Sequence, residues 1–120
     1  MAFNRGDLDD ALQYLHPEGE LRPGIVAPDQ RSRYRGRDEV KEFFESIYDA
    51  FAEVWAELGE VLERGDRILA VERWRVRGRD GIKLDFEVID VYTFRDGLLV
   101  RADGFRDKAE ALKAAGLRDG

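Results

Sequence analysis

Asp90 is the residue of this sequence with the clearest capacity for chemistry. It alternates, along a segment typical of a strand, with the apolar or aromatic residues Phe86, Val88, Tyr92 and Phe94. A carboxylate on such a face is costly to bury unless it is hydrogen-bonded, charge-paired or protonated. One interpretation is a structural acid tied to an arginine. The other is a pocket carboxyl with a raised pKa, able to donate or abstract a proton.

A second acid, Asp103, occupies a similar position on the next expected strand. It alternates there with Leu99, Arg101 and Phe105, and neighbouring strands can bring it close to Asp90. Two carboxyls in an apolar concavity can divide into one acid and one base. An arginine between them would instead keep both ionised. We therefore expect Asp90 and Asp103 to be the catalytic pair if this domain is an enzyme.

The residues expected around these acids depend on how the neighbouring hairpin is aligned. A two-residue turn places Arg73 beside the face of Asp90, whereas a turn one residue longer or shorter places Glu72 and Trp74 there. The apolar count favours the second alignment, but one sequence leaves both open. The expected pocket residues, from strands and helices together, are Tyr14, Phe44, Tyr48, Glu72, Trp74, Val88, Tyr92 and Phe105.

The composition excludes several other kinds of site. The chain has 120 residues, of which 43% are hydrophobic and 38% charged, and this is typical of one globular domain spanning residues 1–120. It contains no cysteine, which excludes disulfides, thiolate nucleophiles and cysteine-based metal centres. His16 is the only histidine, so we expect neither a metal site nor a cofactor.

Charge and hydropathy restrict the partners and the location. A net charge of −6 repels nucleic acid and anionic lipid, so we expect no binding to nucleic acid or membranes. No apolar run approaches the roughly 18 residues needed to span a bilayer. The N-terminus lacks the basic-then-apolar pattern of a signal peptide. These features predict a cytoplasmic protein, and the expected pocket predicts a small hydrophobic molecule as its partner.

Helical periodicity is clearest between residues 40 and 51. Apolar residues recur there at spacings of three and four, from Val40 to Phe51, and predict a helix that covers other elements. A shorter helix is expected over residues 8–15, capped by Asp7 after an earlier helix that ends at Gly6. Residues 17–36 contain all three prolines, so we expect a loop with one or two short edge strands.

From residue 53 onward the hydrophobic period changes to two. Asp107 is expected to cap a last helix over Lys108–Leu117. Helices followed by strands predict an α+β fold, in which the early helices lie on the concave side of a curved antiparallel sheet and a short helix follows. The expected strands, joined by turns that contain glycine, are Val54–Leu62, Ile68–Arg77, Ile82–Phe94 and Leu98–Phe105.

Alternation also assigns apolar residues to the outer face of this sheet. The candidates are Ile89, Val91, Val100 and Ala102, which a lone curved sheet would expose to water. We therefore expect the outer faces of two copies to pack together as a homodimer.

Short segments along nearly the whole chain resemble the SnoaL-like domains of the nuclear transport factor 2-like superfamily. The resemblance implies a cone-shaped domain with a bent sheet wrapped around N-terminal helices, a pocket at the open end, and frequent dimerisation through the outer sheet face. The segments that carry it are Ala2-Phe3-Asn4-Arg5-Gly6-Asp7, Leu15-His16-Pro17-Glu18, Tyr34-Arg35-Gly36-Arg37, Gly65-Asp66-Arg67-Ile68, Tyr92-Thr93-Phe94-Arg95-Asp96-Gly97 and Asp107-Lys108-Ala109-Glu110.

The superfamily includes ketosteroid isomerase, polyketide cyclases, dehydratases, limonene epoxide hydrolase and non-catalytic binding proteins. Asp90 stands where the isomerase has an oxyanion-hole aspartic acid kept protonated by an apolar site, while Pro23 stands at its general base. Asp103 matches one of two catalytic aspartates of the epoxide hydrolase, and Arg75 stands at the other. The resemblance implies a cofactor-independent isomerase, cyclase or lyase, or else a non-catalytic binding or accessory dimerisation domain.

Overall fold

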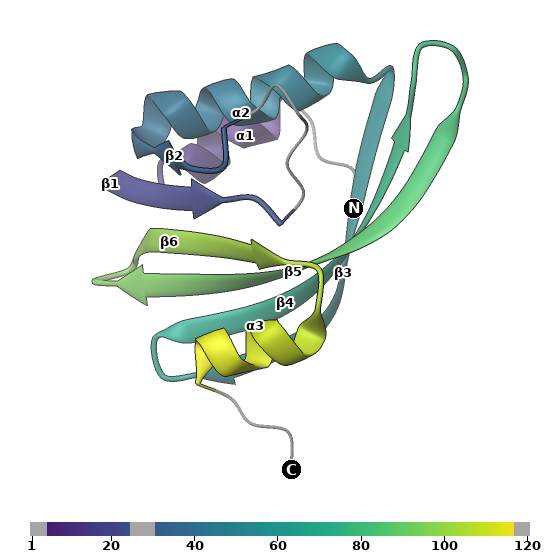
Figure 1. Cartoon of the computed structure of the whole chain (residues 1–120). Coiled ribbons are helices and arrows are strands. Elements are labelled where there is room, and N and C mark those ends of the chain that lie inside the picture. Colours follow the sequence, from purple (N-terminus) through teal and green to yellow (C-terminus); the bar gives the residue numbers. More distant parts are fainter. Residues whose placement is uncertain (1–4, 25–30, 117–120) are drawn as a thin grey trace.

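The fold is the predicted α+β arrangement, seen in a computed structural model that describes residues 5–24 and 31–116 (Figure 1). Six strands form one curved sheet in the order β2-β1-β6-β5-β4-β3. Neighbouring strands are antiparallel except for β1 and β6, which are parallel. In chain order the elements are α1 (Arg5–Leu12), β1 (Leu15–Arg22), β2 (Tyr34–Arg35), α2 (Gly36–Ala50), β3 (Glu53–Arg64), β4 (Arg67–Arg77), β5 (Lys83–Arg95), β6 (Leu98–Phe105) and α3 (Lys108–Ala115).

Helices lie on both faces of the sheet. α1 and α2 lie together on one side, and α3 crosses the opposite face of β4 and β5 (Figure 1). A separate hydrophobic core forms under each layer. The first core joins α1, α2, β1 and β2 around Leu12, Tyr34 and Phe43, and the second lies between α3 and the outer face of the sheet around Leu69 and Leu112.

The helix α2 contains most of the apolar residues whose spacing of three and four predicts a helix. Val40 and Phe43 are its buried residues, which agrees with the predicted spacing. Its first turn is tied down by Glu39, whose carboxylate accepts a hydrogen bond of 3.1 Å from the backbone N–H of Arg35. At its other end Arg79, from the β4–β5 connection, donates to the carbonyl oxygen of Asp49 at 2.8 Å. Both contacts satisfy backbone groups that a helix end leaves without an internal partner.

The N-terminal helix differs from the expected boundaries. α1 runs without a break from Arg5 to Leu12, so Gly6 does not separate two helices. The expected earlier helix falls on residues 1–4, outside the described residues. No helix in the described ranges is long and apolar enough to cross a membrane.

The segment Leu15–Arg22 forms a full strand where a loop with short edge strands is expected. β1 lies inside the sheet between β2 and β6. It tolerates Pro17 because its register against β6 shifts between Leu15 and Glu20, so the ladder is already interrupted there. Parallel pairing with a strand some 80 positions away is invisible to local patterns, and this explains the error.

The apolar residues expected on the outer face of the sheet do not all lie there exposed to water. Ile89 and Val91 do lie on this face, but they are buried beneath Ala111 and Leu112 of α3. Ala102 lies on the other face, among the residues that border the inner cavity. Of the apolar residues that motivated a dimer through this face, Ile89 and Val91 are therefore covered within one chain.

Candidate functional site

A cavity of about 850 Å³ lies between α2 and the inner face of the sheet. α2 packs mainly against β1, and this leaves space between the helix and the inner faces of β4 and β5. The volume lies within the range of sites that bury small organic molecules. The walls are largely apolar and include aromatic side chains from the β2–α2 region, the end of α2 and the strands: Tyr34, Phe43, Phe44, Phe51, Trp74 and Phe86.

The alignment of the β4–β5 hairpin decides which polar groups enter this cavity. Asp90 lies opposite Ala70 and Trp74 lies opposite Phe86, so the longer of the two considered turns is the correct one. Residues 78–82 form this connection, closed by a hydrogen bond of 2.8 Å from the N–H of Gly78 to the carbonyl of residue 82. Glu72 and Trp74 therefore share the cavity face with Asp90.

Asp90, Glu72 and Tyr92 form one hydrogen-bonded cluster in the cavity wall. The Tyr92 hydroxyl donates to a carboxylate oxygen of Glu72 in a very short contact, and lies 3.4 Å from Oδ2 of Asp90. A phenol carries one proton, so it can serve only one of these acceptors at a time. Two carboxyls and one phenol thus meet at one place, on adjacent strands.

The surroundings of Asp90 favour its protonated form. Burial raises the pKa of Asp90 well above its ordinary value, and the negative charge of Glu72 and a hydrogen bond with Glu72 raise it further. The hydrogen bond from Tyr92 opposes this by stabilising the charged form. Burial and the two nearby carboxylates raise the pKa of Tyr92 as well. Both side chains are half-buried, because the surface they retain borders the cavity.

The cluster has no cationic partner among residues 5–24 and 31–116. None of the ion pairs in those ranges involves Asp90 or Glu72, so the interpretation of Asp90 as an acid tied to an arginine is not the arrangement found. The same ranges hold no group of three or more acidic, histidine or cysteine side chains placed to bind a metal ion. Two carboxyls and a phenol can themselves exchange protons and form hydrogen bonds.

Asp103 does not line the cavity that contains Asp90, so the structure does not bring the expected pair together there. The turn at Asp96 and Gly97 has positive φ at both residues, as a tight hairpin requires. Continued regularly, that register would place Asp103 opposite Asp90, but a bulge shifts the pairing at Thr93 and Asp103 lies opposite Val91 instead. A shift of one residue moves a side chain to the other face of the sheet.

On that other face Asp103 is held by arginines. Nε of Arg101 donates to Oδ2 of Asp103 at 2.6 Å, and Nε of Arg22 lies 3.9 Å from Oδ1. These contacts are those expected of a structural acid paired with arginine, at a side chain that is 18% exposed. Glu72 takes the place that Asp103 was expected to fill beside Asp90.

The other expected pocket residues divide into two groups. Three lie away from the cavity: Tyr14 is 62% exposed, Phe105 packs in the outer core beneath α3, and Tyr48 packs against the inner core. The remaining five lie in the cavity wall together with Asp90: Phe44, Glu72, Trp74, Val88 and Tyr92.

The cavity wall also contains residues absent from the expected set. Val76 and Leu84 continue the alternation of β4 and β5, so the two-residue period could have identified them once the register was known. Arg31 and Arg106 also border the cavity. They come from irregular segments that carry no periodic signal, and only the tertiary structure reveals their position.

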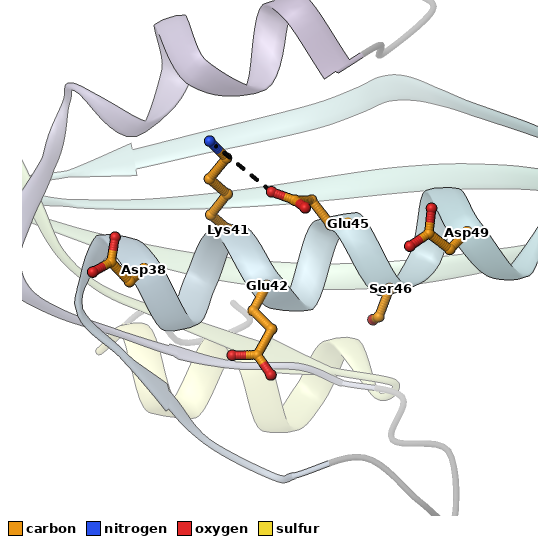
Figure 2. A pocket seen from close by; sticks show the side chains of 6 residues that line it. All are labelled: Asp38, Lys41, Glu42, Glu45, Ser46 and Asp49. Atoms are coloured by element: carbon orange, nitrogen blue, oxygen red, sulfur yellow. Dashed lines mark ion pairs between the residues drawn. The ribbon is translucent and has the colours of Figure 1, made fainter.

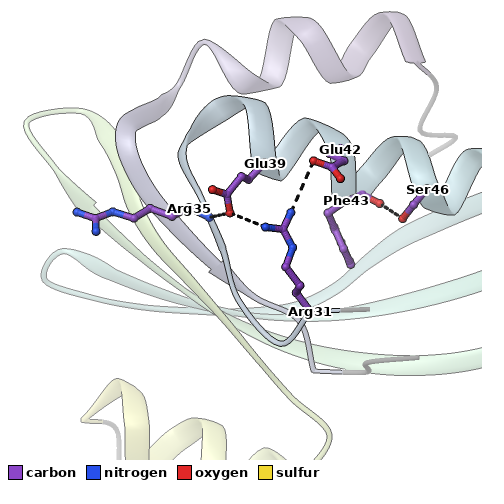
Figure 3. A network of polar contacts seen from close by, with 6 residues as sticks. All are labelled: Arg31, Arg35, Glu39, Glu42, Phe43 and Ser46. Carbon is purple, nitrogen blue, oxygen red and sulfur yellow. Dashed lines mark hydrogen bonds and ion pairs between the residues drawn. The ribbon is translucent and has the colours of Figure 1, made fainter. Parts of the chain in front are cut away.

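A polar network fixes the segment that enters α2 at the edge of the cavity (Figure 3). Arg31 reaches Glu39 at 3.2 Å and Glu42 at 3.6 Å, and its guanidinium lies 4.8 Å from the ring centre of Tyr34. The hydroxyl of Ser46 donates to the carbonyl of Phe43 on the same helix. The rings of Tyr34 and Phe43, whose centres are 4.9 Å apart, lie beside these contacts in the wall of the cavity.

A second, shallower hollow of about 320 Å³ runs along the outer side of α2 (Figure 2). It is lined by acids with a single cation, Lys41, whose amine lies 3.1 Å from Asp9 and 4.0 Å from Glu45. The contact with Asp9 raises the pKa of Lys41. These side chains are exposed charges of a solvated helix face, and the hollow lacks the apolar walls of the inner cavity.

Comparisons with known proteins agree on the fold. A nuclear transport factor 2-like protein of unknown function from Burkholderia pseudomallei has 26% identity and a TM-score of 0.71 over 91% of this chain and 85% of its own. TerC, crystallised with polyporic acid, has 20% identity and a TM-score of 0.71 over the same shares. A Mycobacterium tuberculosis protein in complex with estradiol-17beta-hemisuccinate has 16% identity and a TM-score of 0.72 over 85% and 82%.

A search of curated proteins gives no significant match. The model of the SnoaL-like domain family, in contrast, matches residues 1–102, which include every strand except the last three residues of β6. The match covers most of the chain and agrees with the curved sheet, the helices on its inner side and the cavity between them. This chain therefore belongs to the SnoaL-like domain family.

Proposed function

We propose that this domain binds a small, largely apolar molecule in the inner cavity and catalyses a proton transfer on it. The observation that carries the proposal is the meeting of Asp90, Glu72 and Tyr92 in a cavity whose walls are mostly apolar. Two carboxyls whose environments differ can act as acid and base at neutral pH. Structural neighbours crystallised with polyporic acid and with estradiol-17beta-hemisuccinate support a cavity that receives organic ligands.

In this proposal Asp90 is the proton donor and Glu72 the acceptor. Asp90 retains its proton at higher pH than an ordinary aspartate, because burial and the charge of Glu72 disfavour its ionised form. Tyr92 orients the carboxylate of Glu72 through their hydrogen bond. The reaction classes that need only such a pair are isomerisation, cyclisation, dehydration and hydration, and none of them requires a cofactor.

The test has two stages. Hydrophobic metabolites are first screened by thermal shift, since a ligand of the folded state raises the melting temperature by mass action. Each ligand found is then incubated with protein in D₂O, and deuterium incorporation at carbon is followed by mass spectrometry. Asp90→Asn and Glu72→Gln are expected to bind the ligand and to slow incorporation by about 100-fold or more. Glu87→Gln, an exposed acid of β5 paired with Arg73 on the other face, serves as the control.

The alternative is a ligand-binding domain without turnover. The hydrogen bond that Tyr92 donates to Glu72, with Asp90 3.4 Å away, favours it, because it gives the cluster an internal partner in the absence of a substrate. Ligands that bind with neither product formation nor carbon-bound deuterium would support this alternative and contradict catalysis.

We also propose that the domain is a homodimer, as its resemblance implies. Exposed apolar residues beyond the face covered by α3 could form the contact, among them Leu58 and Val61 of β3, which are 57% and 45% exposed. Light scattering at micromolar concentration should give twice the chain mass of 13.8 kDa. A monomer at that concentration would contradict the proposal.

A further inference from the structure

Some of the acidic residues that border the inner cavity have a cationic partner among the described residues, and others have none there. Five of the residues lining it are acidic. Glu72 and Asp90 form no ion pair with any arginine or lysine of residues 5–24 and 31–116. The other three acids each have an arginine within ion-pair distance: Glu20 with Arg22 at 3.8 Å, Glu42 with Arg31 at 3.6 Å and Asp85 with Arg75 at 2.9 Å.

The cations that border the cavity do not change this imbalance. Arg31 already contacts Glu39 and Glu42. Arg106 follows the end of β6 and is exposed, and it is not among the charges that act on Asp90. An acidic pair in apolar surroundings, with no cation of the protein beside it, is complementary to a cation supplied by a ligand.

Aromatic rings lie beside the acidic pair on the same face. Trp74 is two residues from Glu72 along β4 and lies opposite Phe86 of β5, while Phe44 borders the cavity from α2. The faces of such rings attract cations, most strongly that of tryptophan, and their apolar bodies pack against hydrocarbon. The cavity thus combines negative charge with surfaces that tolerate a positively charged group.

From this arrangement we infer that the ligand is an apolar amine, whose protonated nitrogen lies between Glu72 and Asp90 and whose hydrocarbon part packs against Trp74 and Phe86. The inference rests on the binding part of the proposed function, the alternative without turnover included, because it names the chemical class of that site's ligand. A primary ammonium group has three N–H donors, enough to reach both carboxyls and leave one for a further acceptor. Hydrogen bonds between charged groups are the strong ones in such a site.

The acidic pair makes the binding of an amine depend on pH. A cation beside Asp90 favours its ionised form, so an amine that binds while Asp90 is protonated releases that proton. Affinity for the amine therefore rises with pH until free Asp90 is ionised. The groups that act on Asp90 in the free protein are Glu72, Tyr92 and, more weakly, the charge of Asp103. A neutral ligand of the same shape lacks this dependence.

The experiment compares three probes of one shape by isothermal titration calorimetry between pH 5 and 8. The probes are 1-aminoadamantane, 1-adamantanol and adamantane-1-carboxylate, whose rigid cages are small relative to the cavity of about 850 Å³. The wild type is expected to bind the amine at least about tenfold more tightly than the alcohol, as a charge-assisted contact implies. The carboxylate is expected to bind most weakly, and only the amine to release a proton.

Variants of Glu72 and Asp90 test whether the preference for the amine over the alcohol comes from this acidic pair. Asp90→Asn removes the group whose proton is released, so amine binding is expected to persist without proton release. In Glu72→Gln burial still raises the pKa of Asp90, so amine binding is expected to persist with proton release. In the double variant the amine and the alcohol should bind within about twofold of each other. Glu87→Gln, the matched control on the outer face of β5, should retain the wild-type preference and its pH dependence.

Each outcome decides the matter. An alcohol that binds as tightly as the amine, or an amine preference that survives in the folded double variant, overturns the inference but leaves an apolar binding cavity. Failure of all three probes to bind overturns the proposed binding function as well. Circular dichroism and thermal unfolding establish that each variant is folded before titration.

Discussion

The substitution Asp90→Asn tests the central physical claim about the site, which is that the folded protein disfavours the charge on Asp90. Burial is the largest cause of its raised pKa, followed by the charge of Glu72 and a hydrogen bond with Glu72. Asparagine has nearly the same shape, cannot ionise, and can still donate to Glu72 and accept from Tyr92. The cost of imperfect hydrogen bonding is therefore limited to about 1 kcal/mol.

The sign of the pH effect follows from the two states of the chain. In the unfolded chain Asp90 titrates near an ordinary value of about 3.9. Between that pH and the higher folded pKa, the folded state binds more protons than the unfolded state. The free energy of unfolding of the wild type therefore falls as the pH rises through this window and levels off above the folded pKa. Each unit of difference between the folded and the unfolded pKa lowers the free energy of unfolding by about 1.4 kcal/mol above that window.

Asparagine does not ionise, so the free energy of unfolding of Asp90→Asn does not fall in this pH window. Its stability relative to the wild type should therefore increase from pH 4.5 to pH 8. The assay is urea unfolding followed by the fluorescence of Trp55 and Trp74, with the slope against urea checked for constancy. Asp85→Asn is the control: the same change on the same strand, at a side chain 61% exposed and 2.9 Å from Nε of Arg75. An exposed pair of this kind contributes at most about 1 kcal/mol.

A buried ion pair at Asp90 would give the opposite result. Removing one partner of such a pair typically costs about 3–5 kcal/mol at neutral pH. A loss of that size in Asp90→Asn, without the rise in relative stability between pH 4.5 and pH 8, would refute the assignment of a protonated acid in an apolar cavity.

Three further perturbations test other parts of the structure. Tyr92→Phe removes the hydroxyl that stabilises ionised Asp90, so the pKa of Asp90 should rise further in a carboxyl ¹³C NMR titration; an unchanged or lower value would contradict the hydrogen bond. Gly104→Ala places a Cβ 2.2 Å from the backbone nitrogen of Gly24 beside the cavity and should cost about 1–3 kcal/mol in urea unfolding; wild-type stability would show that this close approach is absent. Asp107→Ala removes the side chain that accepts from the N–H of Ala109 at 2.8 Å, and should cost about 1 kcal/mol, most of which Asp107→Ser should recover.

Local patterns in the sequence determine most of the elements and the class of the fold. The two-residue period places Asp90 on one face with Val88 and Tyr92, and the structure keeps that arrangement. The apolar stripe of α2 and the cap at Asp107 likewise depend only on neighbours a few residues away. Such short-range signals survive in a single sequence because the backbone geometry that produces them is local.

Only the tertiary structure decided which acids meet. The connection over residues 78–82 sets the register that brings Glu72 beside Asp90, and the bulge at the β5–β6 pairing sends Asp103 to the other face. Each of these arrangements depends on the register of two strands to within one residue. A shift of one residue moves every following side chain to the opposite face of the sheet. The parallel pairing of β1 with β6 is likewise non-local. The identity of the acidic pair therefore depends on how distant strands align, which the sequence pattern of either strand alone cannot specify.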